Sequence, residues 1–449
     1  MHKIVIIGGG SVLWTPRLCC DMFLEPALDG SEIVIVDIDA EAAKLCKTYL
    51  EECVRRQNVH WTISIAELDD ALKGADAVVV SISTGGFEMM ECDYSIPGKY
   101  GVNHSVGDTT GPGGIFRTLR NAPVFFDFAE RMALLCPDAW MVHVTNPLSQ
   151  ITRLVSATGL VRCCGLCHEV PITFGLLRKF FGVESENDID ATCVGVNHFT
   201  LLKDLVVKGV KEPMSQLTVR KYVEYVAKGE SESSGTIDDL LKNGTAEKLE
   251  RFFNFWLAEH LGYFPAAGSP HIAENFPRFL NDEAPQNAMK IWRKGVMPWR
   301  PQNKLDLTQK LRDTLAKGEM PPELAAGRSY EPLASGLVGL LTGEPRRIIA
   351  TLPNSGQISN LPKDAAVETW AVASRNGINP MYAGDVPLQY YGFMASVVAE
   401  QELTIQAAFK KDRRLVQQAL FASPLLHQKE RAEELMNEMF AAEKEWFDW

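Results

Sequence analysis

The chain has 449 residues and a formal net charge of −12. This length is enough to bury a large core, in two domains or one extended one, and the acidic balance argues against nucleic acid or an anionic membrane surface as a partner. The ten cysteines lie mostly in apolar segments typical of helices and strands, which favours reduced core thiols in a cytoplasmic protein. We expect no membrane span, since no apolar run approaches about 18 residues, and no signal peptide, since the apolar run at 4–7 leads into glycines.

Short apolar strands alternate with helical patterns up to about residue 200. This alternation predicts an α/β fold with a parallel, doubly wound sheet. Strands are expected at 3–7, 33–36, 77–81 and 140–144, and helices from Trp14 onward, at 41–57 and at 122–136.

Beyond residue 200 the sequence becomes more polar and then mainly helical. Helices are expected at 366–373, 388–411, 414–421 and 428–445, and a short β-rich segment at 347–352. We therefore predict two domains, 1–200 and 201–449, of which the second is α+β, mainly helical, and completes a cleft.

A glycine-rich turn follows the first expected strand. Gly-Gly-Gly-Ser at 8–11 stands between that strand and a helix, where glycine permits a tight turn and close approach of the backbone to a pyrophosphate. Asp37 ends the second strand, and a carboxylate there accepts from a ribose 2′-hydroxyl but repels a 2′-phosphate, which favours NAD over NADP. Leu13 replaces the third glycine of G-x-G-x-x-G. The pattern by itself is therefore also compatible with a glycine turn that binds no ligand. In its strand–helix–strand setting it predicts a Rossmann-type NAD-binding domain at 1–200. The expected cofactor contacts are Gly8, Gly10, Ser11 and Asp37.

Two later strands end in polar residues at the edge that faces the cofactor in a doubly wound sheet. Ser83 lies in Ser-Ile-Ser-Thr-Gly-Gly at 81–86, and Asn146 lies in Thr-Asn-Pro at 145–147. Asparagine before proline is a common turn, but at this edge Asn146 can hydrogen-bond both a cofactor ribose and a substrate hydroxyl. We expect Ser83 and Asn146 to contact the cofactor.

Potential metal ligands gather in the sequence after the last of these strands. Cys-His-Glu-Val at 167–170 places a thiol, an imidazole and a carboxylate side by side, and His198 follows in Gly-Val-Asn-His-Phe. Cys167 as thiolate and His198 as neutral imidazole leave positions open for oxygen donors, which suits a catalytic ion better than a structural one. Asp108, in a glycine-rich stretch at 107–114, is a further carboxylate. A lone cysteine or histidine is more often structural, so the argument depends on their combination beside a dinucleotide site.

Taken in order, these motifs resemble those of family 4 of the glycoside hydrolases, which depend on NAD and a metal ion. The resemblance covers most of the chain and is strongest over residues 1–200. The motifs that carry it are Ile-Ile-Gly-Gly-Gly-Ser at 6–11, Thr-Thr-Gly-Pro-Gly-Gly at 109–114, Thr-Asn-Pro at 145–147, Cys-His-Glu-Val at 167–170 and Gly-Val-Asn-His at 195–198. It implies a Rossmann domain joined to an α/β domain, in homodimers or homotetramers.

The resemblance also implies a substrate class. In that family the tetrad that begins at the metal-binding cysteine tracks with substrate, and Cys-His-Glu-Val goes with α-galacturonidases. Cys-His-Glu alone goes with α-glucosidases, and Cys-His-Gly with α-glucuronidases, so these two activities are the alternatives. The expected substrate is therefore a small uronic-acid or hexose α-glycoside.

The family chemistry implies roles for the site residues. It runs through oxidation at C3 with NAD, removal of the C2 proton, elimination at C1 with metal stabilisation, water addition and reduction that regenerates NAD. By resemblance Cys167 and His198 hold Mn²⁺, with other divalent ions possible, and Asp108 protonates the leaving oxygen. His168 and Glu169 contact sugar hydroxyls or assist proton transfer, and Asn146 holds substrate and cofactor.

The base and the partner of the substrate carboxylate are less specified. In related enzymes the base is a tyrosine or an aspartate, and the corresponding segment at 262–271 has no aspartate, so the candidates are Tyr263 and His271. A uronate needs a cation, preferably a bidentate arginine; Arg278 follows this segment. Glu169 would repel a nearby carboxylate, so with a uronate it must face hydroxyls or the aglycone. The alternatives to Arg278 are Arg17, Arg117 and Arg120.

Two readings from other classes remain. A plain NAD-dependent hydroxyacid dehydrogenase needs no Cys/His metal pair and produces NADH. A nucleotide-sensing binding module binds NAD without turnover. Hydrolysis that needs both NAD and Mn²⁺ separates the three.

Overall fold

A computed structural model describes residues 1–228, 245–276, 280 and 300–449 of the chain. Within these residues twelve strands form one sheet in the order β3-β2-β1-β4-β5-β6-β10-β11-β7-β8-β9, with β12 paired to β11. The strands are β1 (Lys3–Ile7), β2 (Glu32–Val36), β3 (Thr62–Ile65), β4 (Ala77–Val80), β5 (Trp140–His143), β6 (Arg162–Gly165), β7 (Ile189–Val196), β8 (Phe199–Val207), β9 (Phe264–Pro265), β10 (Arg346–Pro353), β11 (Ala366–Ser374) and β12 (Gly377–Pro380).

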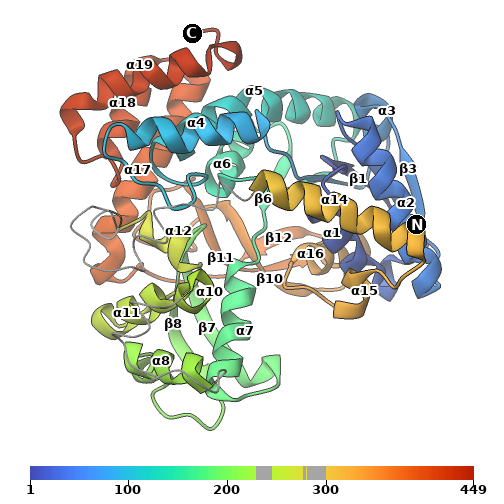
Figure 1. The fold of residues 1–449 in the computed structure, drawn as a ribbon, viewed down its shortest axis with the longest axis horizontal. Coiled ribbons are helices and arrows are strands. Elements are labelled where there is room, and N and C mark those ends of the chain that lie inside the picture. The colour runs from blue at the N-terminus through green and yellow to red at the C-terminus, as the bar shows by residue number, and fades with distance from the viewer. Residues whose placement is uncertain (229–244, 277–279, 281–299) are drawn as a thin grey trace.

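Helices surround this sheet (Figure 1). They are α1 (Trp14–Phe23), α2 (Ala40–Gln57), α3 (Leu68–Leu72), α4 (Gly86–Gly98), α5 (Gly111–Leu135), α6 (Leu148–Thr158), α7 (Glu169–Phe181), α8 (Val219–Lys228), α10 (Ala246–Leu249), α11 (Phe252–Leu261), α12 (Ser269–Ala273), α14 (Arg300–Lys317), α15 (Pro322–Ala326), α16 (Leu333–Thr342), α17 (Leu388–Lys410), α18 (Arg413–Ala422) and α19 (Ala432–Ala442).

The first half of the sheet, β3-β2-β1-β4-β5-β6, is parallel throughout. Its strands are apolar on both faces because helices cover both: Ile4 and Ile6 face a core shared with α1, α2 and α16, whereas Val5 and Ile7 face a core shared with α3, α5 and α6. Side chains in a strand alternate between faces, so one apolar strand supplies both cores. This confirms the predicted doubly wound α/β fold.

The second half of the sheet is antiparallel. β10 pairs with β6 on one side and β11 on the other, β11 pairs with β7, and β8 and β9 complete the edge. A helical second part packs here and over α4–α6: in Figure 1 the C-terminal helices α17–α19 lie against α4 and α5. The sheet runs through residue 200 without a break, and the division into domains at 1–200 and 201–449 stays a prediction.

Two segments differ from their sequence-based expectations. The segment 366–373, expected to be helical, is strand β11, because its Val, Thr and Trp side chains suit a pleated surface and both its edges are paired, to β10 and β7. The helix expected at 122–136 begins earlier, as α5, at Gly111. Pro112 suits a helix start, and Gly114 is needed because a Cβ there would lie 2.4 Å from the carbonyl oxygen of Thr109.

A buried ion cluster ties the C-terminal segment to this core. Arg120 in α5 is fully buried and donates to both carboxylate oxygens of Asp93 in α4, at 2.8 and 2.6 Å, and to Glu443 Oε2 at 2.5 Å. One guanidinium therefore holds together two carboxylates from segments far apart in sequence.

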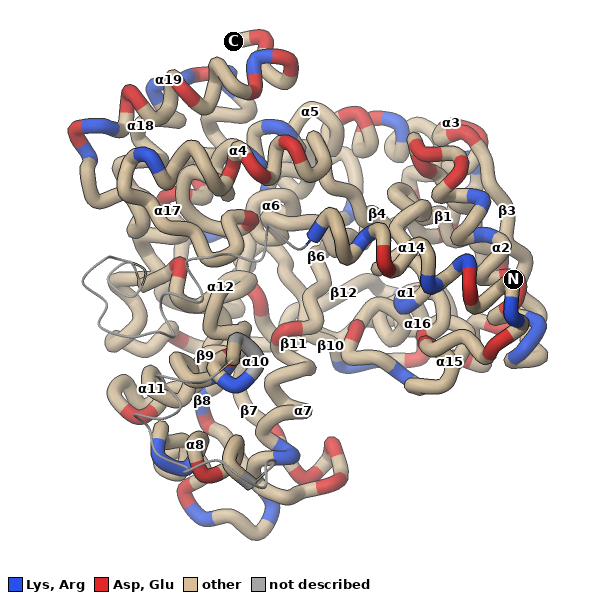
Figure 2. Tube along the Cα trace, in the orientation of Figure 1, with Lys and Arg blue, Asp and Glu red and all other residues tan. Residues whose placement is uncertain are grey.

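Acidic and basic residues are interspersed along the outer helices (Figure 2). Among the described helices, none is both long and apolar enough to cross a membrane.

Replacing Arg120 with Met keeps most of the side-chain volume but leaves the Asp93 carboxylate as an unpaired buried charge and Glu443 without its hydrogen-bond donor. We expect the free energy of unfolding to fall by about 3–5 kcal/mol, measured by chemical denaturation at pH 7. Arg131→Met is the matched control, since Arg131 lies on the same helix and pairs with Asp69 and Asp127 at the surface, where such pairs contribute about 0–1 kcal/mol. Equal losses in the two variants would contradict this role of Arg120.

The excess negative charge of the cluster predicts a pH dependence of stability. Burial, with Asp93 adding to it, raises the pKa of Glu443 to about 8 against the attraction of Arg120, whereas the unfolded carboxyl titrates near about 4.3. The unfolded state then binds fewer protons, so the free energy of unfolding falls as pH rises from about 5 to 8. Glu443→Gln should flatten this fall in denaturation curves recorded across that range; an unchanged slope would show that Glu443 is not its source.

Candidate active site

The glycine turn after β1 is crowded by neighbouring strands. Gly8 has φ +85°, and a Cβ there would lie 2.1 Å from the carbonyl oxygen of Ser81; a Cβ on Gly10 would lie 2.8 Å from Asp37 Oδ2. The backbone N–H of Gly10 donates to Asp37 Oδ2 at 2.7 Å, and Ser11 Oγ accepts from the N–H of Trp14 at 3.2 Å at the start of α1. The turn and Asp37 thus form one unit at the carboxyl end of β1 and β2. A carboxylate has further lone pairs, so Asp37 can still accept from ribose hydroxyls.

Arg117 joins the other predicted cofactor residues. This buried side chain of α5 donates through Nη2 to Ser83 Oγ at 3.1 Å and through Nε to the carbonyl oxygen of Asn146 at 3.1 Å. The Asn146 amide in turn donates to Asp108 Oδ2 at 3.4 Å. The loops after β4 and β5 are therefore fixed to each other and to the carboxylate that precedes α5.

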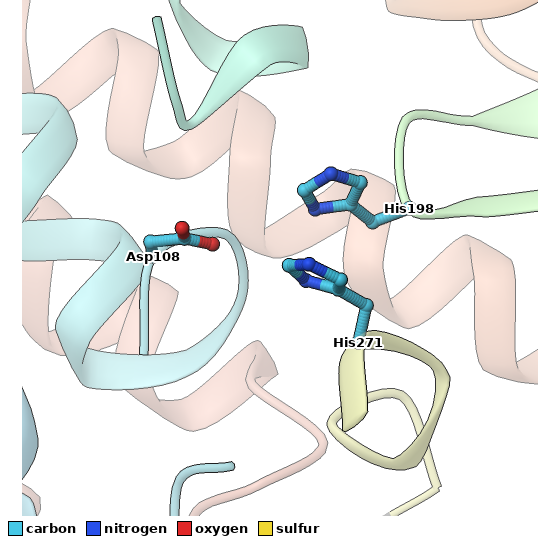
Figure 3. Close-up of side chains that lie close together, drawn as sticks. All are labelled: Asp108, His198 and His271. Atoms are coloured by element: carbon cyan, nitrogen blue, oxygen red, sulfur yellow. The ribbon is translucent and has the colours of Figure 1, made fainter. Parts of the chain in front are cut away.

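Three side chains from distant segments converge beside this edge (Figure 3). Asp108 precedes α5, His198 lies in the turn between β7 and β8, and His271 lies in α12; one ligand atom from each falls within 4.8 Å of the others. The two imidazole rings lie 3.8 Å apart between centroids. His271 Nδ1 is buried without a hydrogen-bond partner among the described residues.

The turn that carries His198 is held from β11. His198 has a left-handed backbone, φ 63°, an unfavourable conformation that needs support from its surroundings. The buried Glu368 supplies it: its carboxylate accepts from Asn197 Nδ2 at 2.8 Å and from Thr200 Oγ1 at 2.9 Å, on either side of His198.

Thr109 fixes the tautomer of His198. Its hydroxyl donates to Asp108 Oδ1 at 2.8 Å, so its single hydrogen is used and it can only accept from His198 Nδ1, also at 2.8 Å. Burial lowers the pKa of His198 to about 3, so the ring is neutral, with its proton on Nδ1 and a lone pair on Nε2. That is the form in which histidine binds a metal ion.

Cys167 lies on the free side of His198. It follows β6, and its Sγ is 3.7 Å from His198 Nε2. Burial, with Glu368 and Glu169 nearby, raises the pKa of the Cys167 thiol well above its ordinary value, so a thiolate here needs a cation. The donor set of sulfur, imidazole nitrogen and carboxylate oxygen, with an unpartnered His271 nitrogen, fits a divalent transition-metal ion. His271, expected as a base, and Asp108, expected as an acid, lie within the same ligand range.

Asp108 is held as a carboxylate. Burial acts to raise its pKa, but His271, Arg300 and His198 outweigh burial and hold the pKa well below its usual range. In this state Asp108 accepts protons or ligates a cation, and it protonates a leaving group only after taking up a proton itself.

His168 is oriented by a residue that the sequence patterns did not reveal. Its Nδ1 lies 2.7 Å from Oε1 of the buried Glu331, and its ring lies 5.7 Å from that of Trp14. Burial lowers the pKa of His168, but contact with Glu331 outweighs burial and raises it. Glu331 is far from His168 in sequence and lies in no motif, so nothing local indicated it.

Glu169 is neutralised by another unexpected partner. Arg251 Nη2 lies 3.3 Å from Glu169 Oε2, and the N–H of Gly268 donates to the same oxygen at 2.9 Å. Burial would raise the pKa of Glu169, but Arg251 and the neighbouring histidines lower it to about 2. Glu169 is therefore a paired carboxylate, anchored at the start of α7.

The remaining expected site residues lie elsewhere. The Tyr263 ring packs edge-on against Tyr390, 6.4 Å between centroids, and Tyr390 donates its hydroxyl hydrogen to the Tyr263 carbonyl oxygen; no contact recorded for the described residues joins Tyr263 to the cluster. Arg278 lies outside the described residues. Arg17 lies 4.0 Å from Glu331. The other two alternatives, Arg117 and Arg120, make the buried contacts given above.

The chain is similar over most of its length to known proteins. The model of the family 4 glycosyl hydrolases matches residues 3–183, and that of their C-terminal domain matches 193–426. An alpha-galacturonidase of Thermoanaerobacter italicus is 33% identical over 460 aligned residues, covering 99% of this chain and 97% of that protein. A putative glucosidase of Bacillus subtilis, 29% identical, superposes with a TM-score of 0.83 over 98% of this chain and 99% of its own. A 6-phospho-alpha-glucosidase from gut microorganisms, solved with NAD and Mn²⁺, shares the fold at 18% identity, with a TM-score of 0.81 over 99% of each chain.

The hydrogen bond from His198 to Thr109 predicts an effect on metal affinity. Thr109→Val keeps the shape but removes the acceptor that fixes the ring, so we expect Mn²⁺ to bind about 10- to 100-fold more weakly, measured by isothermal titration calorimetry. Thr118→Val is the matched control, because Thr118 is a buried threonine of α5 whose hydroxyl donates only to the Gly114 carbonyl oxygen. Unchanged Mn²⁺ affinity in the Thr109 variant would contradict the assignment.

Proposed function

Since this chain belongs to family 4 of the glycosyl hydrolases, we propose that it is an α-galacturonidase that works with NAD and a divalent cation, Mn²⁺ in the first instance. The observation that carries the proposal is that Cys167, His198 and Asp108 meet in contact with Asn146, in a sheet that also carries the dinucleotide-type glycine turn. Oxidation–reduction chemistry and metal chemistry then meet on one substrate. The substrate class is supported by Cys-His-Glu-Val at 167–170 and by the full-length similarity to an alpha-galacturonidase.

The cofactor sites follow from the geometry of the edge. The turn of Gly8, Gly10 and Ser11, with Asp37, would hold NAD, and Cys167 with His198 would hold the cation. When bound, NAD supplies a reversible hydride acceptor, and the cation supplies Lewis-acid stabilisation of negative charge on sugar oxygens.

The chain's own residues orient the sugar and handle protons. The Asn146 amide contacts Asp108, its backbone is held by Arg117, and it would face both cofactor and substrate hydroxyls. His168, held by Glu331, donates to a sugar oxygen. Glu169, anchored by Arg251, accepts from a hydroxyl without bringing a net charge.

The proton transfers need a base and an acid within reach of the sugar. Of the two candidate bases, His271 lies in the cluster with a free Nδ1, whereas Tyr263 packs against Tyr390, which favours His271 as acceptor of the C2 proton. Asp108, a carboxylate beside it, would donate to the leaving oxygen after taking up a proton, which matches the cyclic use of one proton in an elimination followed by water addition.

The wider setting is part of the proposal. All ten cysteines are free thiols, which supports a reducing, cytoplasmic location. Assembly as a homodimer or homotetramer stays a prediction from the family resemblance. Within the family, α-glucosidase and α-glucuronidase activity are the alternatives, since the tetrad separates these substrates by resemblance alone.

The purified protein should hydrolyse para-nitrophenyl α-galacturonide only with NAD, Mn²⁺ and a reductant, and in heavy water the product should carry deuterium at C2. Omitting either cofactor tests the two alternatives from other classes. A dehydrogenase predicts net NADH production, and a binding module predicts no turnover. The matching glucuronide, galactoside and glucoside test the substrate. Cys167→Ser should abolish the metal-dependent activity, with Cys92→Ser, a cysteine of α4, as control. Activity after removal of NAD and addition of EDTA, or product without C2 deuterium, would refute the mechanism.

A further inference from the structure

A galacturonide brings a carboxylate into a site that already holds three. Asp108, Glu169 and Glu331 are all buried or nearly so, and a further anion enters only where a cation meets it. An arginine suits this role, because its planar fork binds both oxygens of a carboxylate. Such an arginine needs guanidinium N–H groups that are not already bound to other groups of the protein.

Three arginines near the site are committed to other groups of the protein. Arg120 is fully buried between Asp93 and Glu443. Arg117 is committed to Ser83 and the Asn146 backbone. Arg251 faces Glu169 and Thr173 with only 7% of its side chain exposed. Each holds the framework together, and drawing it toward a substrate would leave a buried carboxylate or carbonyl oxygen unpaired.

Arg300 differs from these three. Its Nη2 lies 3.6 Å from Asp108 Oδ2, too far for a hydrogen bond, and 26% of its side chain is exposed. Over the described residues this ion pair is its one recorded polar contact. The guanidinium therefore stands beside the cluster of Asp108, His198 and His271 without a hydrogen-bond partner among the described residues, and it is partly exposed to solvent.

The backbone of Arg300 is held in place by α14. This helix lies across the face of the Rossmann-type half (Figure 1) and packs against α2, with Leu311 buried in the core that α1 and α2 share with β1. Its first residue, Arg300, points back to Asp108. The half of the molecule that carries the glycine turn thus places a cation beside Asp108.

We propose that Arg300 binds the C6 carboxylate of the substrate and determines the preference for uronides over neutral hexosides. This inference rests on the proposed α-galacturonidase function and adds the residue that recognises its charge. Asp108 keeps the guanidinium positioned in the free protein. The substrate carboxylate accepts hydrogen bonds from the guanidinium N–H groups that Asp108 does not use. Arg17, 43% exposed beside Glu331 and Trp14, is the competing arginine.

The test compares charged and neutral ligands in the full-length protein with Mn²⁺ and NAD bound. Arg300→Gln, Arg300→Lys, Arg17→Gln and Arg312→Gln are titrated with D-galacturonate and with D-galactose, and their KM and kcat are measured on para-nitrophenyl α-galacturonide. Arg312 is the matched control, an exposed arginine on the same helix α14. The Mn²⁺ affinity of each variant is measured separately, since a merely structural role through Asp108 would lower it.

We expect Arg300→Gln to weaken galacturonate binding and raise KM by about 10- to 100-fold, with galactose and Mn²⁺ affinity within threefold of wild type. The galacturonate affinity of Arg300→Lys should lie between those of wild type and Arg300→Gln, because lysine keeps the positive charge but not the planar fork of donors. Arg312→Gln should match wild type. Unchanged galacturonate affinity in Arg300→Gln, an equal loss for galactose, or a loss in Arg17→Gln instead would overturn the assignment. Wild-type protein that cleaves no galacturonide would instead refute the function on which it rests.

Discussion

The geometry of the candidate site depends on one buried carboxylate, that of Glu368. It lies in β11 and accepts hydrogen bonds from Asn197, just before His198, and from Thr200, two residues after it. It also accepts from Thr351 in β10 at 3.3 Å. A left-handed histidine is stable only when its surroundings fix it. Here a single side chain fixes both flanks of the turn, so the direction of the His198 ring is set from the neighbouring strand.

The same strands determine which residues meet. Cys167 follows β6 and His198 follows β7, but these strands are not neighbours; β10 and β11 lie between them. The inserted strands β10 and β11 therefore determine how closely Cys167 Sγ and His198 Nε2 approach each other. By contrast, the glycine turn and Asp37 come from adjacent strands β1 and β2, which assemble by a simple strand–helix–strand unit. The cofactor side of the site is thus local in sequence, and the metal side is not.

This difference explains what the sequence reveals. Several site residues stand in short sequence patterns that indicate their chemistry: the turn at 8–11, Asp37, Asn146, Cys167 and His198. The parallel strands are apolar runs of the expected length. The segment 366–373 misleads because alanine favours helices in isolation, whereas pairing on both edges decides its structure.

Other site residues carry no local signal at all. Glu331, Arg251 and Arg300 are single charged residues far from the groups they contact, and only the folded chain brings them there. Thr109 is an intermediate case: it begins the Thr-Thr-Gly-Pro-Gly-Gly motif beside Asp108, yet its effect on the His198 tautomer follows from two distances that no sequence pattern contains. Charge pairing across a fold is decided by tertiary structure, so a sequence without its fold leaves such partners undetermined.

The insertion of β10 and β11 between β6 and β7 also has a consequence for biosynthesis. A growing chain that has not yet reached Arg346, where β10 begins, lacks the two strands that close the sheet, so the edges of β6 and β7 remain unpaired and open to wrong partners. During that interval the thiol of Cys167 is not yet enclosed. Between the synthesis of β6 and that of β10 the chain is therefore a half-sheet exposed to aggregation and oxidation, and its candidate site forms among the last features of the fold.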